Sequence, residues 1–169
     1  MLILKIFTII GGFGLCTYGG YKYSSKFVIR ERYFAELLEL CEGIRADINF
    51  MHLSLYPILE KYRDSFKSFL SVQLSGAAKL LDDNRSITEA ALKEYIPQGP
   101  LTGDEYETVI RFFNTLGKSD AENQTASIEG FKAAFKKYHG DAAEKKKKYS
   151  SLYWKLGLLA GAALTIFVI

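Results

Sequence analysis

Apolar residues recur at helical spacing over most of the chain, and no stretch alternates between apolar and polar positions as a β-strand does. From Arg30 onward, two positions in every seven are apolar, which is the seam of a long helix. A second seam of this kind lies before the carboxyl end. The first seam consists of Phe34, Leu37, Cys41, Ile44, Ile48, Met51 and Leu55, and the second of Ile128, Phe131, Phe135, Tyr138, Ala142, Tyr149 and Leu152. The pattern predicts two long antiparallel helices whose seams pack together as a core.

Helix start and stop signals divide the region between the two seams into shorter helices. A hydroxyl stands three residues before a glutamate at Ser86, Thr102 and Ser119, as in a capping box. Pro57 suits a first helical turn, and Gly117 suits the position after a helix end. We expect helices at about residues 30–53, 55–64, 65–82, 87–96, 103–116 and 120–168. The helix at 103–116 should lay one apolar face on the long pair, made of Tyr106, Val109, Ile110, Phe113 and Leu116.

The amino end is an apolar run of the length needed for a membrane span. Residues 6–21 carry no charge, and Lys5 lies close enough to the start to reach the headgroups. A helix needs about 20 residues to cross a hydrocarbon core of roughly 30 Å. A cleavable signal peptide is the rival interpretation, but Tyr18-Gly-Gly-Tyr21 stands where that would need an A-x-A pattern. We therefore expect an uncleaved transmembrane segment in residues 1–24.

The carboxyl end is a shorter uncharged run, Leu156 to Ile169, behind aromatic residues and a lysine cluster. It is short for a span and would need local thinning of the bilayer; a buried core helix is the alternative interpretation. Lys145 to Lys148 favour the span, because such a cluster is ordinary at a membrane surface. We expect a second transmembrane segment in residues 154–169, and a cytoplasmic helical bundle domain in residues 25–153.

Small residues recur four apart in both apolar runs. They are Gly12, Cys16 and Gly20 in the first run, and Gly157 and Gly161 in the second. Small side chains at this spacing let two helix backbones approach closely, although glycine is also frequent in membrane helices for other reasons. We interpret these five positions as candidates for packing between the two membrane helices.

The charges are distributed unevenly along the chain. Residues 27–144 carry 14 basic and 19 acidic side chains, so the body is acidic although the whole chain has a net charge of +3. The remaining basic residues lie in or beside the apolar ends, which argues against a nucleic-acid-binding surface. Because the basic residues gather on the domain side of both runs, the positive-inside rule places the body in the cytoplasm and both termini across the membrane.

Two groups of acidic residues are candidates for a partner surface. Glu36, Glu39 and Glu42 lie off the apolar seam and should be solvated; Asp104, Glu105 and Glu107 open a short helix. Such a surface would steer a basic partner. For the second group, complementing the helix dipole is the simpler interpretation.

No catalytic motif is present in the sequence. It contains no phosphate loop, no GxGxxG, no HExxH and no nucleophile elbow. Cys16 and Cys41 do not make a disulfide framework, and the isolated His52 and His139 are too few ligands for zinc. We expect a protein that is not an enzyme, with no cofactor or metal, and that binds neither nucleic acid nor a small-molecule substrate.

The stretch from Phe113 to Gln124 is the most specific in the chain. It reads Phe113-Asn-Thr-Leu-Gly117-Lys-Ser-Asp120 and is followed by Gln124. Together with Glu31-Arg32, Pro57-Ile-Leu59 and Trp154-Lys-Leu-Gly157, it resembles the stage III sporulation protein AB family of endospore-forming bacteria over essentially the full length. The positions that match the family signature are Phe113, Leu116, Gly117, Asp120 and Gln124.

The resemblance implies a non-enzymatic membrane platform in the secretion-like channel complex between mother cell and forespore, required for endospore formation. The soluble domain of that family is similar to the platform proteins of type II secretion and type IV pilus systems. The implied partners are the cytoplasmic ATPase and other membrane proteins of the complex, and the lipid bilayer of the mother-cell membrane around the forespore. A membrane-tethered coiled-coil stator or signalling component is the alternative, although a transmitting rod would not need the inserted helices.

Overall fold

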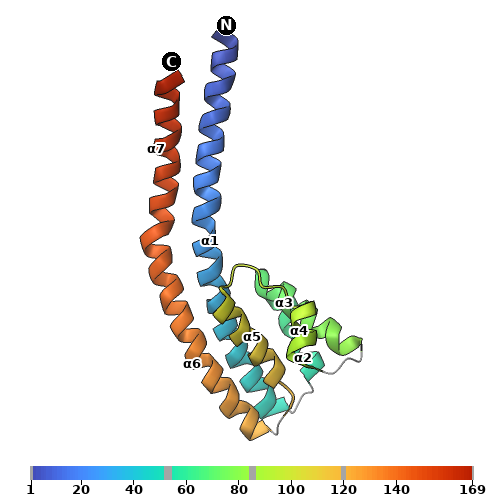
Figure 1. Cartoon of the computed structure of the whole chain (residues 1–169). Helices are drawn as coiled ribbons and strands as arrows, with labels where there is room; N and C mark the ends of the chain where they lie inside the picture. Colours follow the sequence, from blue (N-terminus) through green and yellow to red (C-terminus); the bar gives the residue numbers. More distant parts are fainter. Residues whose placement is uncertain (1, 52–54, 84–86, 119–120, 169) are drawn as a thin grey trace. The chain divides into compact units, whose positions relative to one another are not determined.

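The computed structural model describes residues 2–51, 55–83, 87–118 and 121–168, with side chains for residues 11–48, 56–83, 87–118 and 122–166. Within these ranges every regular element is a helix, which confirms the all-α prediction (Figure 1). The elements are α1 (Leu2–Met51), α2 (Leu55–Ser65), α3 (Phe69–Asp82), α4 (Glu89–Tyr95), α5 (Gly103–Thr115), α6 (Ala121–Lys145), the π-helical turn η1 (Lys146–Ser150) and α7 (Ser151–Val168).

Contacts divide the chain into two compact units. Unit 1 comprises Met1–Glu31 and Asp141–Ile169, and unit 2 comprises Arg32–Gly140. Unit 2 therefore contains all of α2 to α5, the part of α1 after Glu31 and most of α6. The borders of these units come from contacts within the chain, whereas the segments expected at residues 1–24 and 154–169 are defined by crossing a membrane. The membrane segments therefore stay predictions.

Most of the predicted seam residues that fall in unit 2 belong to its core, while Phe131 and Tyr138 are half-buried. Phe34, Leu37, Cys41, Ile44 and Ile48 of α1 are buried, as are Ile128 and Phe135 of α6. The predicted Met51 and Leu55 lie outside the side chains that the structure describes. Along the pair, the Phe34 ring contacts the Tyr138 ring with centroids 5.5 Å apart, and further along α1 Arg45 bonds Glu129 at 3.2 Å. Residue numbers thus rise on α1 as they fall on α6, so the antiparallel packing is confirmed within this unit.

Helix α5 packs on the long pair as predicted, but it buries a wider face. The predicted Val109, Ile110, Phe113 and Leu116 are buried, and Tyr106 is half-buried. Phe112 was not among the predicted residues, yet it is fully buried, with its ring 5.6 Å from Phe131 and 5.4 Å from Phe135. The reason is that α5 contacts neighbours on more than one side, so its buried face is wider than a single stripe.

The helix ends confirm some of the predicted caps. The Thr102 amide donates to the Glu105 carboxylate at 2.9 Å, and Gly117 has a φ of +78° directly after the end of α5. Ser86 lies outside the described residues; the cap that the structure shows for α4 is Thr88, which accepts a hydrogen bond from the Ala91 amide at 3.2 Å. The third predicted cap, at residue 119, lies outside the described residues.

Helix α3 begins later than predicted. The pattern predicts a helix from residue 65, but α3 begins at Phe69, and Ser68 caps it by accepting a hydrogen bond from the Leu70 amide at 3.1 Å. From α3, Gln73 accepts a hydrogen bond from the Tyr33 hydroxyl at 2.5 Å and donates to the Pro97 carbonyl at 2.8 Å. This fully buried amide therefore joins α3 to α1 and to the loop after α4.

In unit 1, α1 and α7 lie side by side and antiparallel (Figure 1). The sequence predicts one unbroken helix over residues 120–168, but the π-helical turn η1 interrupts it at Lys146–Ser150. A π turn holds one residue more than an α turn, so it moves the face that contacts α1 by one position. Tyr153 accordingly contacts α1 in the place predicted for Leu152, which is 46% exposed.

Within the residues that the structure describes, no helix is both long enough and apolar enough to cross a membrane.

Candidate functional site

The part of unit 1 where α1 approaches α7 is the first candidate site. Gly20 and Gly157 lie in backbone contact, because a Cβ added to Gly20 would be 2.9 Å from the Gly157 Cα and 2.8 Å from the Tyr153 carbonyl oxygen. A Cβ on Gly157 would in turn lie 2.9 Å from the Cys16 carbonyl oxygen. No residue larger than glycine fits this crossing without moving a backbone.

The other two glycines of the predicted packing set meet side chains. A Cβ on Gly12 would lie 2.9 Å from Leu164, and one on Gly161 would lie 2.8 Å from the Phe13 ring. Flexible side chains can yield at these two positions, so they tolerate substitution better than Gly20 and Gly157. That this packing takes place in lipid stays a prediction.

An aromatic cluster follows on the domain side of the glycine contact. The Tyr23 ring lies 4.5 Å from the Tyr153 ring in an edge-to-face arrangement, and Phe27 stacks parallel to Tyr153 at 5.9 Å. Tyr149, in η1, contacts Phe27 with ring centroids 5.7 Å apart. Such pairs contribute about 0.5–1.5 kcal/mol each beyond their buried area.

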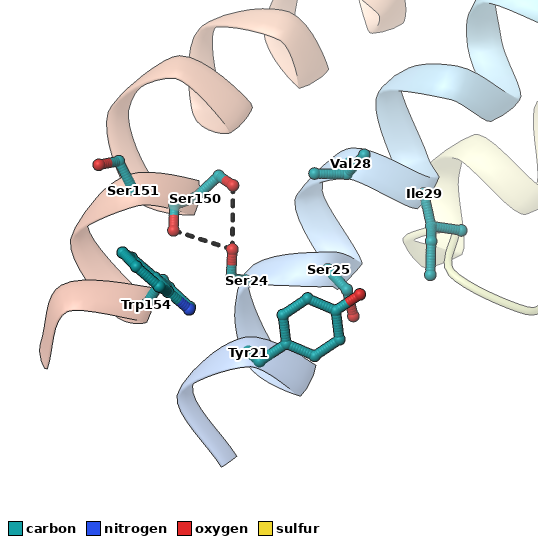
Figure 2. Close-up of a pocket in the computed structure, with 8 residues that line it drawn as sticks. All are labelled: Tyr21, Ser24, Ser25, Val28, Ile29, Ser150, Ser151 and Trp154. Atoms are coloured by element: carbon teal, nitrogen blue, oxygen red, sulfur yellow. Dashed lines mark hydrogen bonds between the residues drawn. The ribbon is translucent and has the colours of Figure 1, made fainter. Parts of the chain in front are cut away.

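Beside this cluster, two serines join the helices by hydrogen bonds. The Ser24 hydroxyl donates to the Ser150 carbonyl at 2.8 Å, and the two hydroxyl oxygens lie 2.9 Å apart (Figure 2). Because Ser24 has one proton, the Ser150 hydroxyl is the donor of the second bond. Ser150 closes η1, so the π turn sets the register in which the serines meet. A serine pair leaves no hydropathy signal, so the sequence pattern does not predict it.

An open groove of about 700 Å³ runs beside the serine pair. Most of its lining is apolar, and the Trp154 indole and the Tyr21 ring stand at one end of it (Figure 2). The groove is lined by Tyr21, Ser24, Ser25, Val28, Ile29, Ser150, Ser151 and Trp154. Several of the large side chains are unusually accessible for apolar groups, with Ile29 and Trp154 each 45% exposed.

Several lysines lie on the two helix segments that form the groove. Lys146 bonds Glu31 at 2.9 Å, whereas the Lys26 and Lys148 ammonium groups stand over the rings of Tyr23 and Tyr149. Both cations lie about 5 Å from the ring centroids, at 5.1 Å and 5.3 Å, in cation–π geometry. Unit 1 therefore combines an apolar groove with several lysines on the same two helix segments.

The acidic residues predicted to form a partner surface do not share one environment. The expectation that Glu36 is solvated is wrong, since it is 9% exposed and accepts hydrogen bonds from Arg32 at 2.8 Å and from the Ser68 hydroxyl. Glu42 is exposed but paired with Lys132 and Arg45. The hydrogen bond from Lys132 is the largest influence on Glu42 and holds its pKa below the usual value.

The second acidic group also separates. Glu105 is 2% exposed and serves the helix cap, which agrees with the simpler interpretation of this group. Glu107 bonds Lys93 at 2.6 Å, and this bond raises the pKa of that lysine. Of the six candidates, Glu39 and Asp104 are exposed carboxylates that take part in none of the ion pairs and caps described above. The other four carboxylates are engaged largely in helix caps and ion pairs.

The signature stretch has a structural role at the junction of α5 and α6. Phe113 and Leu116 are buried, and Gly117 takes the left-handed conformation that a side chain would strain. Gln124, at the start of α6, is 7% exposed. Asp120 lies outside the described residues. The described signature residues thus serve packing and, at Gly117, the end of α5.

The chemistry of the described residues is that of a packed scaffold. Among them, no group of three or more histidine, cysteine or acidic residues could hold a metal ion. Burial raises the pKa of the Cys41 thiol from 9.0 to about 12, and it raises the pKa of the Tyr33 hydroxyl above its usual value. Both groups therefore stay protonated at neutral pH. That the protein needs no cofactor and is not an enzyme stays a prediction.

Comparisons with known proteins agree with the resemblance of the sequence. A family model described as Stage III sporulation protein AB (spore_III_AB) matches residues 5–169. A curated protein of Bacillus subtilis (strain 168), named Stage III sporulation protein AB, is 23% identical over 156 residues, covering 90% of this chain and 91% of that protein. No solved structure matches the chain. The family match extends over both units and includes the stretch from Phe113 to Gln124.

Proposed function

We infer that the chain has a role in sporulation, because it belongs to the stage III sporulation protein AB family. Within that role we propose a non-enzymatic membrane platform, on which other proteins of the channel complex between mother cell and forespore assemble. The observation that carries the proposal is unit 2, a compact helical bundle built into a chain whose two ends are apolar. A bundle of this kind offers several faces to partners at once, as a platform must.

The proposed membrane attachment rests on the two ends of the sequence. Residues 6–21 and Leu156–Ile169 carry no charge, and lysines stand on the domain side of both runs. In the proposal, residues 1–24 and 154–169 cross the mother-cell membrane around the forespore, and residues 25–153 lie in the cytoplasm. The backbone contact between Gly20 and Gly157 supports this, since small residues are what bring helices together in lipid.

The cytoplasmic ATPase of the complex is the proposed partner of unit 2. The acidic charge of the body suits a basic partner surface. Of the six acidic candidates, Glu39 and Asp104 support this contact best, because both are exposed. Other membrane proteins of the complex are the proposed neighbours of the helices in unit 1.

Crosslinking in sporulating cells tests the platform. A photoreactive residue replaces Glu39 or Asp104 in the full-length chain, and covalent products are identified after denaturing purification. Recovery of a hexameric ATPase is the expected result. A matched control carries the photoreactive residue at Lys136, which is also exposed but lies on α6. Recovery of receptors or rotary ATPase subunits would instead favour a stator or signalling component.

The stator or signalling alternative has one observation in its favour. Helix α1 runs without interruption from Leu2 to Met51, so a displacement at one end of it could reach the other. The inserted helices α2 to α5 remain without a purpose under this alternative, and we therefore prefer the platform.

Topology is tested separately with a reporter inserted in the chain. Gln98 is the suitable position, because it is exposed in the loop after α4. Gly76 is not suitable, since a Cβ there would lie 2.2 Å from the Tyr95 carbonyl oxygen and any insertion would disrupt the contact of α3 with α4. The reporter at Gln98 should be cytoplasmic, and a fusion at the carboxyl end should be external. A cytoplasmic carboxyl end would show that Leu156–Ile169 does not cross.

A further inference from the structure

The groove beside the Ser24–Ser150 pair has apolar walls, and the helix segments that form it carry lysines. Its walls include Val28, Ile29 and Trp154, which are 38%, 45% and 45% exposed. Large apolar side chains that stay accessible in one hollow mark a place where something apolar binds. The serine hydroxyls at the base are already hydrogen-bonded to each other, so the groove presents mainly hydrocarbon and ring surface (Figure 2).

Lysines are frequent in the two helix segments that form the groove. The two segments that line it, residues 20–29 and 146–155, contain six lysines and no acidic residue. One of the six, Lys146, is bonded to Glu31 at 2.9 Å. The other five are exposed, and they are Lys22, Lys26, Lys147, Lys148 and Lys155. An occupant that satisfies both parts of the site must therefore be apolar along its length and anionic at one end.

We propose that this groove binds one anionic phospholipid, with its phosphate among the exposed lysines and its acyl chain passing Tyr21 and Trp154 towards the bilayer. The proposal rests on the proposed membrane attachment, which places Tyr21 and Trp154 where the membrane segments begin. A phospholipid meets both requirements of the site, since it joins a hydrocarbon chain to a phosphate. A basic pocket between two membrane helices is where such headgroups bind.

A second copy of the chain is a poorer occupant of the groove. It would bring the same six lysines to the contact, and like charges across an interface oppose association. Free phosphate would satisfy the lysines but would leave the apolar walls exposed. These two occupants give different results from a phospholipid in a single binding experiment.

Trp154 makes the groove directly observable, because it is the chain's single tryptophan and it lines the site. The full-length chain in a mild nonionic detergent is titrated with dihexanoyl phosphatidylglycerol, dihexanoyl phosphatidylcholine or sodium phosphate, and Trp154 emission is recorded. We expect a saturable blue shift with phosphatidylglycerol, at concentrations about tenfold or more below those needed with phosphatidylcholine. Sodium phosphate should leave the emission unchanged.

Two pairs of variants test the lysines and the walls of the groove separately. Lys22→Gln with Lys147→Gln should weaken phosphatidylglycerol binding by about fivefold for each lysine removed. The control, Lys136→Gln with Lys137→Gln, removes two exposed lysines of unit 2 and should bind as the unaltered chain does. Ser25→Phe should block the groove, whereas Gly19→Phe adds a ring to the same helix where nothing lies within 4 Å and should not.

Several results would overturn the proposal. These are an equal response to phosphatidylcholine, a blue shift with phosphate alone, a shift that depends only on protein concentration, or unchanged binding by Ser25→Phe. Membrane attachment is measured independently, by alkaline extraction of the chain from vesicles of phosphatidylcholine alone. Release from those vesicles would contradict the proposed attachment; retention without preference for phosphatidylglycerol would contradict only the lipid site.

Discussion

Gly20 on α1 and Gly157 on α7 lie so close that a Cβ built on Gly20 would be 2.9 Å from the Gly157 Cα. Gly20→Ala should therefore separate the two helices and destabilise the full chain by about 1–3 kcal/mol, as overpacking does elsewhere. The measurement is the midpoint of thermal unfolding in a mild detergent, followed by circular dichroism.

The matched control for this change is Gly19→Ala. Gly19 is on the same helix, but nothing lies within 4 Å of the Cβ that alanine would add. It therefore reports the gain in helix propensity alone, which is about 1 kcal/mol in favour of alanine. Equal midpoints for the two variants would show that α1 and α7 do not touch at Gly20.

Phe135 and Phe131 lie on one face of α6 but differ in burial. Phe135 is fully buried, whereas Phe131 is half-buried and lines an open groove between α5 and α6. Phe135→Ala should cost about 3–5 kcal/mol, because it leaves a cavity in the core. Phe131→Ala should cost clearly less. Chemical denaturation of the two variants side by side measures the difference, and a loss below about 1 kcal/mol for Phe135 would place that ring outside the core.

Much of the fold follows from the sequence because the signals are local. Helix periodicity and the caps at Thr102 and Gly117 depend on residues a few positions apart, so they predict where helices begin and end. The antiparallel pairing of α1 with α6 follows from two matching seams. Ser68 was missed as a cap because no glutamate follows three residues later. Phe112 was missed because its burial depends on how many neighbours surround α5.

The site was less predictable, because its features arise from tertiary contacts. The spacing of small residues points to Gly20 and Gly157, but nothing local indicates that Ser24 and Ser150 meet. The π turn that ends at Ser150 is the reason that the contact is hard to predict. Its inserted residue changes which face of the helix meets α1 without changing the hydropathy of the sequence. Glu36 was expected in solvent from its place off the seam. Instead α3 covers it, and the Ser68 hydroxyl donates to it.

Cys41 is fully buried, and its thiol should react slowly because only the exposed thiolate is a good nucleophile. In a chain carrying Cys16→Ser, labelling of Cys41 with a thiol reagent at pH 8 should be at least about a hundredfold slower than in denaturant. Labelling at the rate of the denatured chain would show that the seam opens readily or is exposed.

The same thiol should make the fold sensitive to alkali. Burial raises the pKa of Cys41 from 9.0 to about 12, so the thiol ionises near pH 9 only when the chain unfolds. The contribution of the buried thiol to the free energy of unfolding is therefore complete below pH 9. It declines as the pH rises towards 12, by up to about 1.4 kcal/mol for each pH unit. Unfolding free energies at pH 8.5 and 10 measure the slope. Cys41→Ser should reduce it, and an unchanged slope would assign it to other groups.

Glu36 and Glu39 are three residues apart on α1, but charge reversal should affect stability strongly at Glu36 and only slightly at Glu39. Glu36 is 9% exposed and bonded to Arg32 and Ser68, so Glu36→Lys should destabilise unit 2 by about 1–3 kcal/mol. Glu39→Lys changes an exposed side chain and should stay within about 0.5 kcal/mol. Denaturant unfolding of both variants measures this, and equal losses would contradict the burial of Glu36. Only Glu39 is thus a fair test of partner binding in this group.

Asp104 and Glu105 are adjacent in the first turn of α5. Substitutions at these two positions distinguish a role in capping from a role in partner binding. The Glu105 carboxylate accepts the Thr102 amide at 2.9 Å and is 2% exposed, so Glu105→Gln should lower the melting temperature through loss of about 1 kcal/mol. Asp104→Asn removes an exposed charge from the same turn and keeps its shape. It should change the melting temperature little, by about 0.3–1 kcal/mol of dipole interaction at most.

Binding to the cytoplasmic ATPase completes this comparison. If Asp104 contacts a basic surface of that partner, Asp104→Asn should slow association and flatten its dependence on salt, because exposed charges act mainly on the association rate. Glu105→Gln should leave binding unchanged at temperatures well below its melting point, since that carboxylate is turned into the helix end. Surface plasmon resonance at two salt concentrations distinguishes the two variants. Identical association rates for Asp104→Asn and the unaltered chain at low salt would remove α5 from the partner surface and leave Glu39 as its acidic residue.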